Sequence, residues 1–192
     1  MMAEVDSKKN EQPEALTQRL LAHLRCGEVE AAELLEQGYR SALIRFCWGY
    51  LGDTEWAEDA VQEIFFIVLK SPSVPDAFRS WLYKIARNQC FNMLRQRARR
   101  PDAGRLPAAS QVDAELTGQL TGLVRAEAVD RLQGWIGQLS DAQREVLRLR
   151  YVEDLSRGEI GEVLDIPEPA VKSRLFEALK KLRDLAGEVE TF

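Results

Sequence analysis

Two clusters of basic side chains are the feature of this sequence best suited to binding chemistry, because they could contact phosphate groups. The first cluster, from Arg79 to Arg105, has eight basic residues and one acidic residue, Asp102. The second cluster holds Lys172, Arg174, Lys180, Lys181 and Arg183. Either cluster alone is typical of a solvated helix face. Two of them on a chain with a net charge of −5 indicate a polyanion contacted at two places, and nucleic acid is the polyanion they favour.

Side chains suited to catalysis or metal binding are sparse. His23 is the only histidine, so neither a histidine-based triad nor a multi-histidine metal site can form within the chain. Cys26 follows His23 by one helical turn, but two ligands are too few for a metal, and a surface histidine near a helix end is the simpler interpretation. The sequence has no glycine-rich phosphate loop and no paired-carboxylate signature. We therefore expect no enzyme activity, no catalytic residue, no metal and no cofactor.

The composition predicts a folded protein in the cytoplasm. Of the 192 residues, 45% are hydrophobic and 30% are charged, which argues against global disorder. No apolar run reaches the roughly 18 residues of a membrane span, and residues 1–16 lack the apolar core of a secretory signal. Cys26, Cys47 and Cys90 are far apart and odd in number, which predicts reduced, buried thiols.

Apolar residues recur at helical spacing throughout, without the alternation that strands show. This pattern predicts an all-α fold: two small helical domains joined by a flexible linker. Residues 101–122 are small and polar, with two prolines and three glycines, as expected of such a linker. The expected boundaries are 1–12 for a disordered N-terminus, 13–100 for the first domain and 123–192 for the second.

Local signals mark several helix ends. Gly52-Asp53 is expected to end the second helix, and Thr54 to cap the third. Two prolines within residues 71–75 exclude a helix there. Ser140 with Gln143 has the form of a capping box.

The helix from Phe78 to about Arg99 separates an apolar face from a basic one. The apolar face holds Leu82, Ala86, Cys90 and Met93, and the basic face holds Lys84, Asn88, Asn92, Arg95 and Arg99, with Trp81 beside them. Basic and amide side chains next to an aromatic ring suit phosphate contacts and base stacking on a single strand. Trp81 could instead belong to the core, and both interpretations stay open. The loop before this helix, 71–77, could hold an unstacked base.

The segment from Ser156 to Arg183 predicts a helix-turn-helix. A short helix, begun by a capping box of Ser156 with Glu159, meets a turn at residues 165–167 and is followed by a longer helix. Gly161 provides a small residue where the two helices cross. The longer helix is expected to bury Val171, Leu175, Leu179 and Leu182, and to expose Pro169, Ser173, Phe176, Glu177 and Lys180, flanked by Lys172, Arg174 and Lys181. An ordinary helical hairpin is the alternative, but the spacing and basic flanks favour a second helix that enters the major groove.

The segment from Glu58 to Phe66 is acidic on one side and strongly apolar on the other. Phe65 and Phe66 are adjacent, so they cannot both face the same core. Asp59, Gln62, Glu63 and Phe66 could form a protein-docking surface, although this segment alone favours a solvated helix face.

Three motifs, in order along the chain, resemble the extracytoplasmic-function (ECF) group of bacterial sigma factors. They are AEDAVQEIF at 57–65, WLYKIARN at 81–88 and VKSRL at 171–175. The resemblance covers residues 28–185. It implies a sigma factor that binds core RNA polymerase, recognises the −10 and −35 elements of promoter DNA and is controlled by an anti-sigma factor.

The resemblance also implies a role for each segment. The first domain would be sigma region 2, the second would be sigma region 4, and the linker would thread through the polymerase between them. Core polymerase would be bound through Glu58, Asp59, Val61, Gln62, Glu63, Phe65 and Phe66. The −10 element would be recognised and melted through Arg79, Trp81, Lys84, Arg87, Asn88, Asn92, Arg95 and Arg99. The −35 element would be read through Ser156, Glu159, Pro169, Lys172, Ser173, Arg174, Phe176, Glu177, Lys180 and Lys181.

The chain departs from the family pattern in its helix-turn-helix. Pro169-Ala170 stands where the family usually has Gly-Thr, and Phe176 replaces an often basic residue and could pack on a thymine methyl. The turn has Asp165 where glycine is frequent, and aspartate tolerates left-handed backbone better than most residues. The −35 sequence therefore does not transfer from relatives.

The main alternative is a free-standing transcription regulator of LuxR-like type that binds DNA by itself through the same helix-turn-helix. Its N-terminal half would need strands and a phosphate-accepting or ligand-binding pocket, and the sequence indicates neither.

We predict that the isolated protein binds duplex promoter DNA weakly, because its net charge is negative and the linker leaves its two DNA surfaces unaligned. A mobility-shift assay at physiological salt measures this affinity. Tight, sequence-specific binding by the free protein would contradict the prediction.

Overall fold

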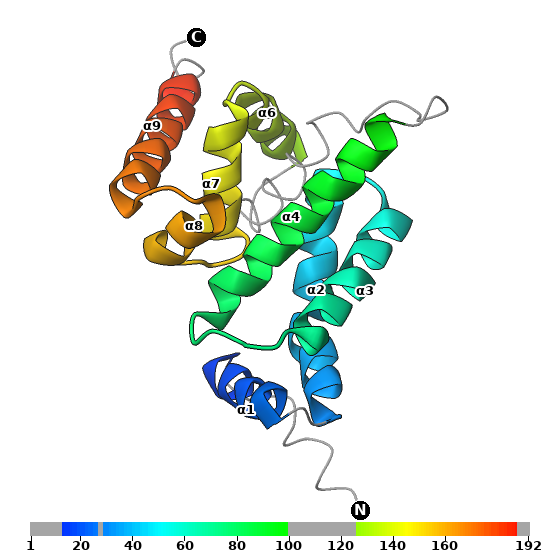
Figure 1. Cartoon of the computed structure of the whole chain (residues 1–192). Coiled ribbons are helices and arrows are strands. Elements are labelled where there is room, and N and C mark those ends of the chain that lie inside the picture. The colour runs from blue at the N-terminus through cyan, green and yellow to red at the C-terminus, as the bar shows by residue number, and fades with distance from the viewer. Residues whose placement is uncertain (1–12, 27–28, 100–125, 188–192) are drawn as a thin grey trace, which may run out of the picture.

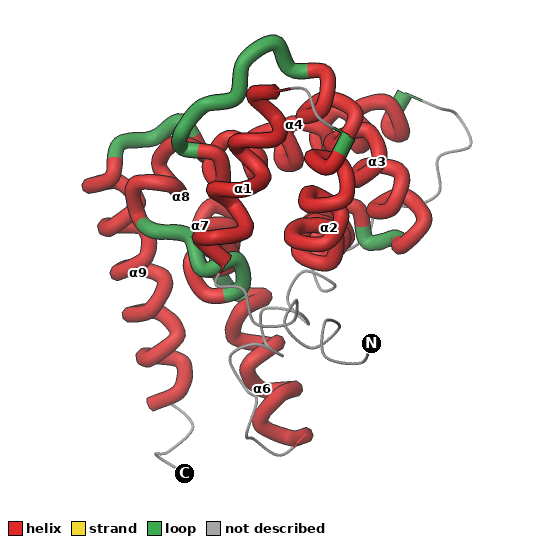
Figure 2. Tube along the Cα trace, turned by 90° about the horizontal axis from the view of Figure 1, so that it is seen from below, coloured by secondary structure: helices red, strands yellow, loops and turns green. Residues whose placement is uncertain are grey.

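The computed structural model describes residues 13–26, 29–99 and 126–187, so the expected N-terminal tail and the 101–122 linker lie outside the described residues. All regular structure in these ranges is helical, which confirms the all-α prediction (Figure 2). The helices are α1 (Pro13–Cys26), α2 (Glu30–Leu51), α3 (Thr54–Lys70), α4 (Phe78–Ala98), α6 (Ala126–Gly137), α7 (Asp141–Tyr151), α8 (Arg157–Leu164) and α9 (Glu168–Gly187). Among the described helices, none is long and apolar enough to cross a membrane.

The N-terminal half is built on α2, against which α1, α3 and α4 pack (Figure 1). Gly52 ends α2 in a left-handed conformation, with φ 66°, and its N–H donates to the Trp48 carbonyl at 2.7 Å. Asp53 then caps α3, because its side chain accepts the Trp56 N–H at 3.0 Å. The predicted cap, Thr54, is therefore wrong by one residue: it is the first residue of the helix.

The core of this half is made by the apolar faces that the periodicity predicted. Phe46 on α2, Ile64 on α3 and Leu82 on α4 are completely buried. Cys47 and Cys90 are buried free thiols, as expected, and hydrogen bonding between them, together with burial, raises the pKa of Cys47. Cys26 is a free thiol too, but it lies exposed at the end of α1, so the prediction of burial is wrong for it. The end of a helix at the margin of the fold offers no second layer to cover it.

The C-terminal half holds the predicted helix-turn-helix, in α8 and α9. Both expected capping boxes are present, Ser140 with Gln143 before α7 and Ser156 with Glu159 before α8. Asp165 ends α8 in the left-handed conformation, with φ 54°. On α9, Val171 and Leu175 are buried as predicted, but Leu179 is 38% exposed and Ala178 lies in the core instead.

Helix α4 separates the two halves. It packs against α2 and α3 on one side and against α8 on another, so the described residues of both halves form one continuous hydrophobic cluster (Figure 1).

We predict that Gly161→Ala lowers the free energy of unfolding by about 1–3 kcal/mol. A Cβ at this position would lie 2.8 Å from the Ile166 carbonyl oxygen, so the turn backbone, rather than the crossing helix, requires glycine here. The matched control is Gly158→Ala on the same helix, where an added Cβ meets nothing within 4 Å. Urea unfolding followed by circular dichroism measures both variants. A Gly161→Ala variant as stable as the Gly158→Ala variant would contradict this account.

Candidate nucleic-acid interface and docking face

The outer face of α3 combines acidic and apolar side chains. Its exposed residues include Glu58, Asp59, Gln62 and Glu63. Phe66 is 60% exposed, with the Lys70 ammonium 5.7 Å from its ring centroid. An exposed phenylalanine among carboxylates is unusual for a face that only meets water, and it suits a protein partner.

The predicted docking residues differ in how deeply their side chains are buried. Val61 is completely buried in the core, so the expectation that its side chain belongs to the docking surface is corrected: it anchors α3 from beneath. Phe65 is half-buried and packs against the core. Ile67 and Leu69, exposed at 39% and 42%, were missed by the sequence analysis and enlarge the apolar part of the helix surface beside Phe66.

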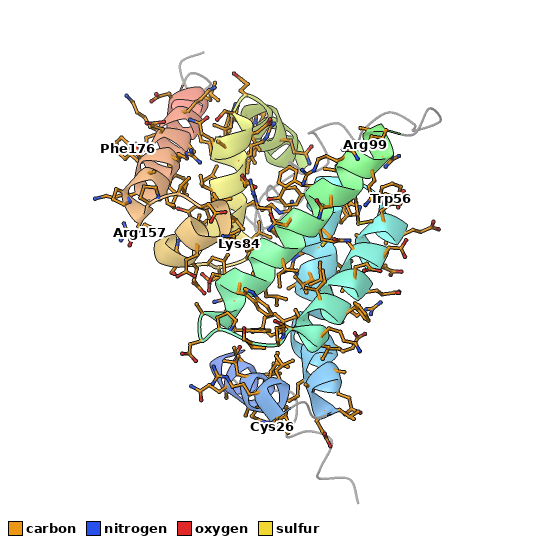
Figure 3. The ribbon with its side chains drawn as sticks, in the orientation of Figure 1. Cys26, Trp56, Lys84, Arg99, Arg157 and Phe176 are labelled. Carbon is orange, nitrogen blue, oxygen red and sulfur yellow. The ribbon has the colours of Figure 1, made fainter. Side chains whose placement is uncertain are left out.

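The second half of α4 presents an open basic face. Asn88, Asn92, Arg95 and Arg99 are exposed, and the Arg95 guanidinium donates to Asn92 Oδ1 at 2.8 Å. Arg99 marks the end of the helix in Figure 3, beyond the edge of the C-terminal half. These residues could contact a nucleic-acid backbone in the arrangement described.

The first half of α4 is covered by the C-terminal half. Arg79 Nη2 donates to the Glu153 carbonyl at 2.9 Å, Lys84 forms an ion pair with Asp165, and Arg87 Nε donates to Glu145 Oε1 at 2.8 Å. Partial burial disfavours the charged form of Arg87, but the hydrogen bond and charge of Glu145 outweigh it and raise its pKa. The cations predicted to meet DNA phosphates therefore meet acceptor groups of the same chain.

Trp81 is neither fully buried in the core nor fully exposed for base stacking, the two roles that the sequence allows. Its ring is half-buried, packs against the core and lies 5.9 Å, between centroids, from the ring of Phe78. Part of the indole therefore supports the helix while the rest reaches solvent, and its stacking role stays a prediction.

The outer face of α9 is open. Its exposed residues from the predicted −35 set are Pro169, Lys172, Ser173, Phe176, Glu177, Lys180 and Lys181, and Arg174 is half-buried. Phe176 is 65% exposed and points away from the molecule, as does Arg157 of α8 (Figure 3). Ser173 Oγ donates to Glu177 Oε1 at 3.2 Å, which fixes one polar pair on this face.

Some predicted −35 residues already have partners within the fold. Ser156 and Glu159 satisfy each other's backbone N–H groups in the capping box, at 3.2 and 2.7 Å. Glu159 also lies 3.9 Å from Arg79, and Lys181 donates to the Gln138 carbonyl. Their roles in DNA binding stay predictions, because DNA would compete with these internal contacts for the same side chains.

Two buried charged residues where the halves meet were not predicted from the sequence. Arg148 is only 3% exposed, and its Nη2 donates to the Arg45 carbonyl at 2.9 Å. Glu153, 4% exposed, accepts the Tyr83 hydroxyl at 2.7 Å. Burial raises the pKa of the Glu153 carboxyl, although the Tyr83 hydrogen bond and nearby arginines oppose the shift. The available signal was an arginine inside the run 146–149, whose other members are apolar.

Both halves match sigma-factor family models. Residues 35–100 match the model described as Sigma-70 region 2, and residues 135–184 match Sigma-70, region 4.

Similar proteins extend along nearly the whole chain. The chain is 32% identical over 188 residues to the ECF RNA polymerase sigma factor SigW of Bacillus subtilis, covering 90% of this chain and 100% of the relative. It is 30% identical over 176 residues to the ECF RNA polymerase sigma-E factor of Escherichia coli, covering 86% and 92%. Among solved structures, CnrH in complex with the cytosolic domain of CnrY has a TM-score of 0.59 at 23% identity, covering 90% of this chain and 98% of that one. That last likeness concerns the fold.

Proposed function

Because this chain belongs to the ECF group of RNA polymerase sigma factors, as its three motifs predicted, we propose a separate role for each of its exposed surfaces. The chain is an alternative sigma factor that directs core RNA polymerase to specific promoters. In our proposal the outer face of α3 docks on core polymerase, α4 with the 71–77 loop engages the −10 element, and α9 reads the −35 element. The observation that carries the proposal is 32% identity to a sigma factor over that relative's full length.

We assign α3 to docking because its outer face carries both carboxylates and exposed apolar side chains. The carboxylates of Asp59 and Glu63 suit a basic protein surface, and an exposed phenylalanine can fill an apolar pocket on the partner. The same carboxylates would repel DNA phosphates, which separates this face from the nucleic-acid surfaces. Ile67 and Leu69 extend the apolar contact.

The DNA assignments rest on the opposite charge and on shape. Basic and amide groups of α4 suit the backbone and unstacked bases of a melted strand. A helix that projects from a helix-turn-helix suits the major groove, where Lys172 and Arg174 would contact phosphates or guanine and Phe176 a thymine methyl. The catalysis of RNA synthesis would belong to the polymerase, and the protein would act with it in the cytoplasm.

We extend the proposal to control by an anti-sigma factor. The fold relative CnrH was solved in complex with the cytosolic domain of CnrY, and this chain has exposed apolar side chains on both halves, Phe66 and Phe176 among them. A separate protein that covers such surfaces would hold the sigma factor away from polymerase or DNA.

We predict that Asp59→Ala with Gln62→Ala weakens binding to core polymerase several-fold, because both exposed side chains lie on the proposed docking face. Lys172→Ala with Arg174→Ala should leave core binding intact and reduce transcription from promoters that depend on the −35 element, since each lost contact costs about 1–3 kcal/mol. Pull-down with purified core polymerase and run-off transcription separate the two effects. Loss of core binding in the recognition-helix variant would contradict the assignment.

The first experiment is a pull-down with core RNA polymerase followed by transcription from a library of genomic fragments. We expect the chain to bind core and to direct new start sites, whose alignment gives the promoter. A chain that ignored core yet selected DNA fragments would instead be a free-standing regulator, the alternative that the two matched sigma regions do not favour.

A further inference from the structure

A cavity of about 410 Å³ is lined by residues of α1, α2, α4 and the loop after α7. This volume is in the range of small-molecule sites, which combine apolar walls with a few polar groups that orient the ligand. Of the residues assigned above to polymerase or DNA, Arg79 alone belongs to the lining that the structure describes. The proposed function therefore leaves the cavity without a role.

Glu153 contributes a completely buried carboxyl group to this cavity, with its side chain 0% exposed. Its Oε2 accepts the Tyr83 hydroxyl at 2.7 Å. Its Oε1 is buried as well, and within the described part of the chain it has no hydrogen-bond partner. Burial raises the pKa of this carboxyl. A buried acceptor without a donor costs free energy, so a ligand that brings an N–H group to Oε1 gains a favourable contact.

Two arginines supply positive charge to the same cavity. Arg45 Nη2 lies 3.9 Å from Glu153 Oε2, which is longer than a hydrogen bond. Arg79 donates through Nη2 to the carbonyls of Glu153 and Asp154, at 2.9 and 3.4 Å. A guanidinium has five N–H donors, and both side chains are more than a third exposed, so each can also meet an anionic group in the cavity.

This mixture of charges selects against a simple ion. A cation or a plain amine would meet the guanidinium groups of Arg45 and Arg79, and a plain anion would meet the Glu153 carboxyl. A molecule with an ammonium group next to a carboxylate matches both signs and has no net charge. Its ammonium group would favour the ionised form of the buried carboxyl, against the effect of burial.

The remaining walls of the cavity suit an aliphatic group. Leu16 of α1 and Ala42 of α2 are half-buried, and Val152, just after α7, is buried. The hydroxyl groups of Thr17 and Tyr39 also belong to the lining and are joined to each other by a hydrogen bond of 2.7 Å. An aliphatic side chain placed against the apolar residues would be removed from water without leaving a polar atom unsatisfied.

We propose that this cavity binds a small aliphatic α-amino acid, whose ammonium group donates to Glu153 Oε1 and whose carboxylate contacts Arg45 and Arg79. Its side chain lies against Leu16 and Val152. Binding is non-covalent and needs no metal or cofactor. Because the lining comes from helices far apart in sequence, the site exists only in the folded chain, and the amino acid therefore raises the stability of the fold by mass action.

Isothermal titration calorimetry of the full-length chain with L-leucine tests the site. We expect saturable binding at one site and a rise in Tm with L-leucine concentration. L-leucinamide lacks the carboxylate and N-acetyl-L-leucine lacks the ammonium group, so each should bind about tenfold more weakly or worse, because each loses a charge-assisted hydrogen bond. L-leucinamide also resembles the N-terminus of a peptide, so this analogue distinguishes a free amino acid from a peptide end.

Two variants test the assignment of the cavity. Glu153→Gln removes the charge, while its amide oxygen can still accept the Tyr83 hydroxyl. Ala42→Leu fills the cavity with a residue of high helix propensity. Each should lower the affinity for L-leucine about tenfold or more. The matched controls are Glu55→Gln, the same charge change at an exposed position of α3, and Ser41→Leu, the same added side chain at an exposed position of α2.

Saturable binding of L-leucine by the wild type and both controls, with weaker binding in both cavity variants, would support the proposal. A wild type that does not bind L-leucine would overturn it, and so would equal affinity for either analogue or unchanged affinity in the cavity variants. Circular dichroism checks that each variant folds, and where one does not, the other variant and the two analogues decide. The measurements need neither polymerase nor DNA, so their failure would leave the proposed function standing.

Discussion

A buried guanidinium seated on one helix ties the two halves together, beside the packing of α8 on α4. Arg148 reaches the α2 carbonyls only because Gly49 has no side chain. That contact ties α7 to α2, while α8 packs along α4 and the outer face of α9 is turned toward solvent. In this arrangement the cations of the first half of α4 meet acceptors of the same chain, whereas the second half of α4 and the outer face of α9 stay exposed.

The charge pattern explains why such a placement covers a nucleic-acid surface. Cations that suit phosphates also suit carboxylates, and this chain has 31 acidic residues against 26 basic ones. Glu145 and Asp165 therefore act as internal competitors for Arg87 and Lys84. Since the competitors belong to the same chain, their effective concentration is high, and even weak pairs hold cations that a dilute polyanion would otherwise bind.

Local signals predicted most of the fold, because helix periodicity and capping depend on neighbours in sequence. The capping boxes at Ser140 and Ser156 and the left-handed Asp165 were predicted in this way. One error is local, since Asp53 and not Thr54 caps α3. The other errors lie where distant packing decides: Val61 belongs to the core, Leu179 is exposed, and Cys26 has nothing to cover it. Arg148 and Glu153 escaped notice because a buried charge is recognisable only when its partner, far along the chain, is known. Recognition of the three family motifs supplied the functional assignment that charge alone left open.

The docking face and the covered first half of α4 lie on different helices. α3 packs chiefly on α2 and α4, and none of the larger helix–helix contacts among the described elements joins it to α8 or α9. A partner that touches only α3 therefore leaves the contacts of Arg79, Lys84 and Arg87 in place. A DNA backbone that is to meet these three cations must displace the chain's own acceptors from them, and a contact made with α3 alone supplies no free energy for that exchange.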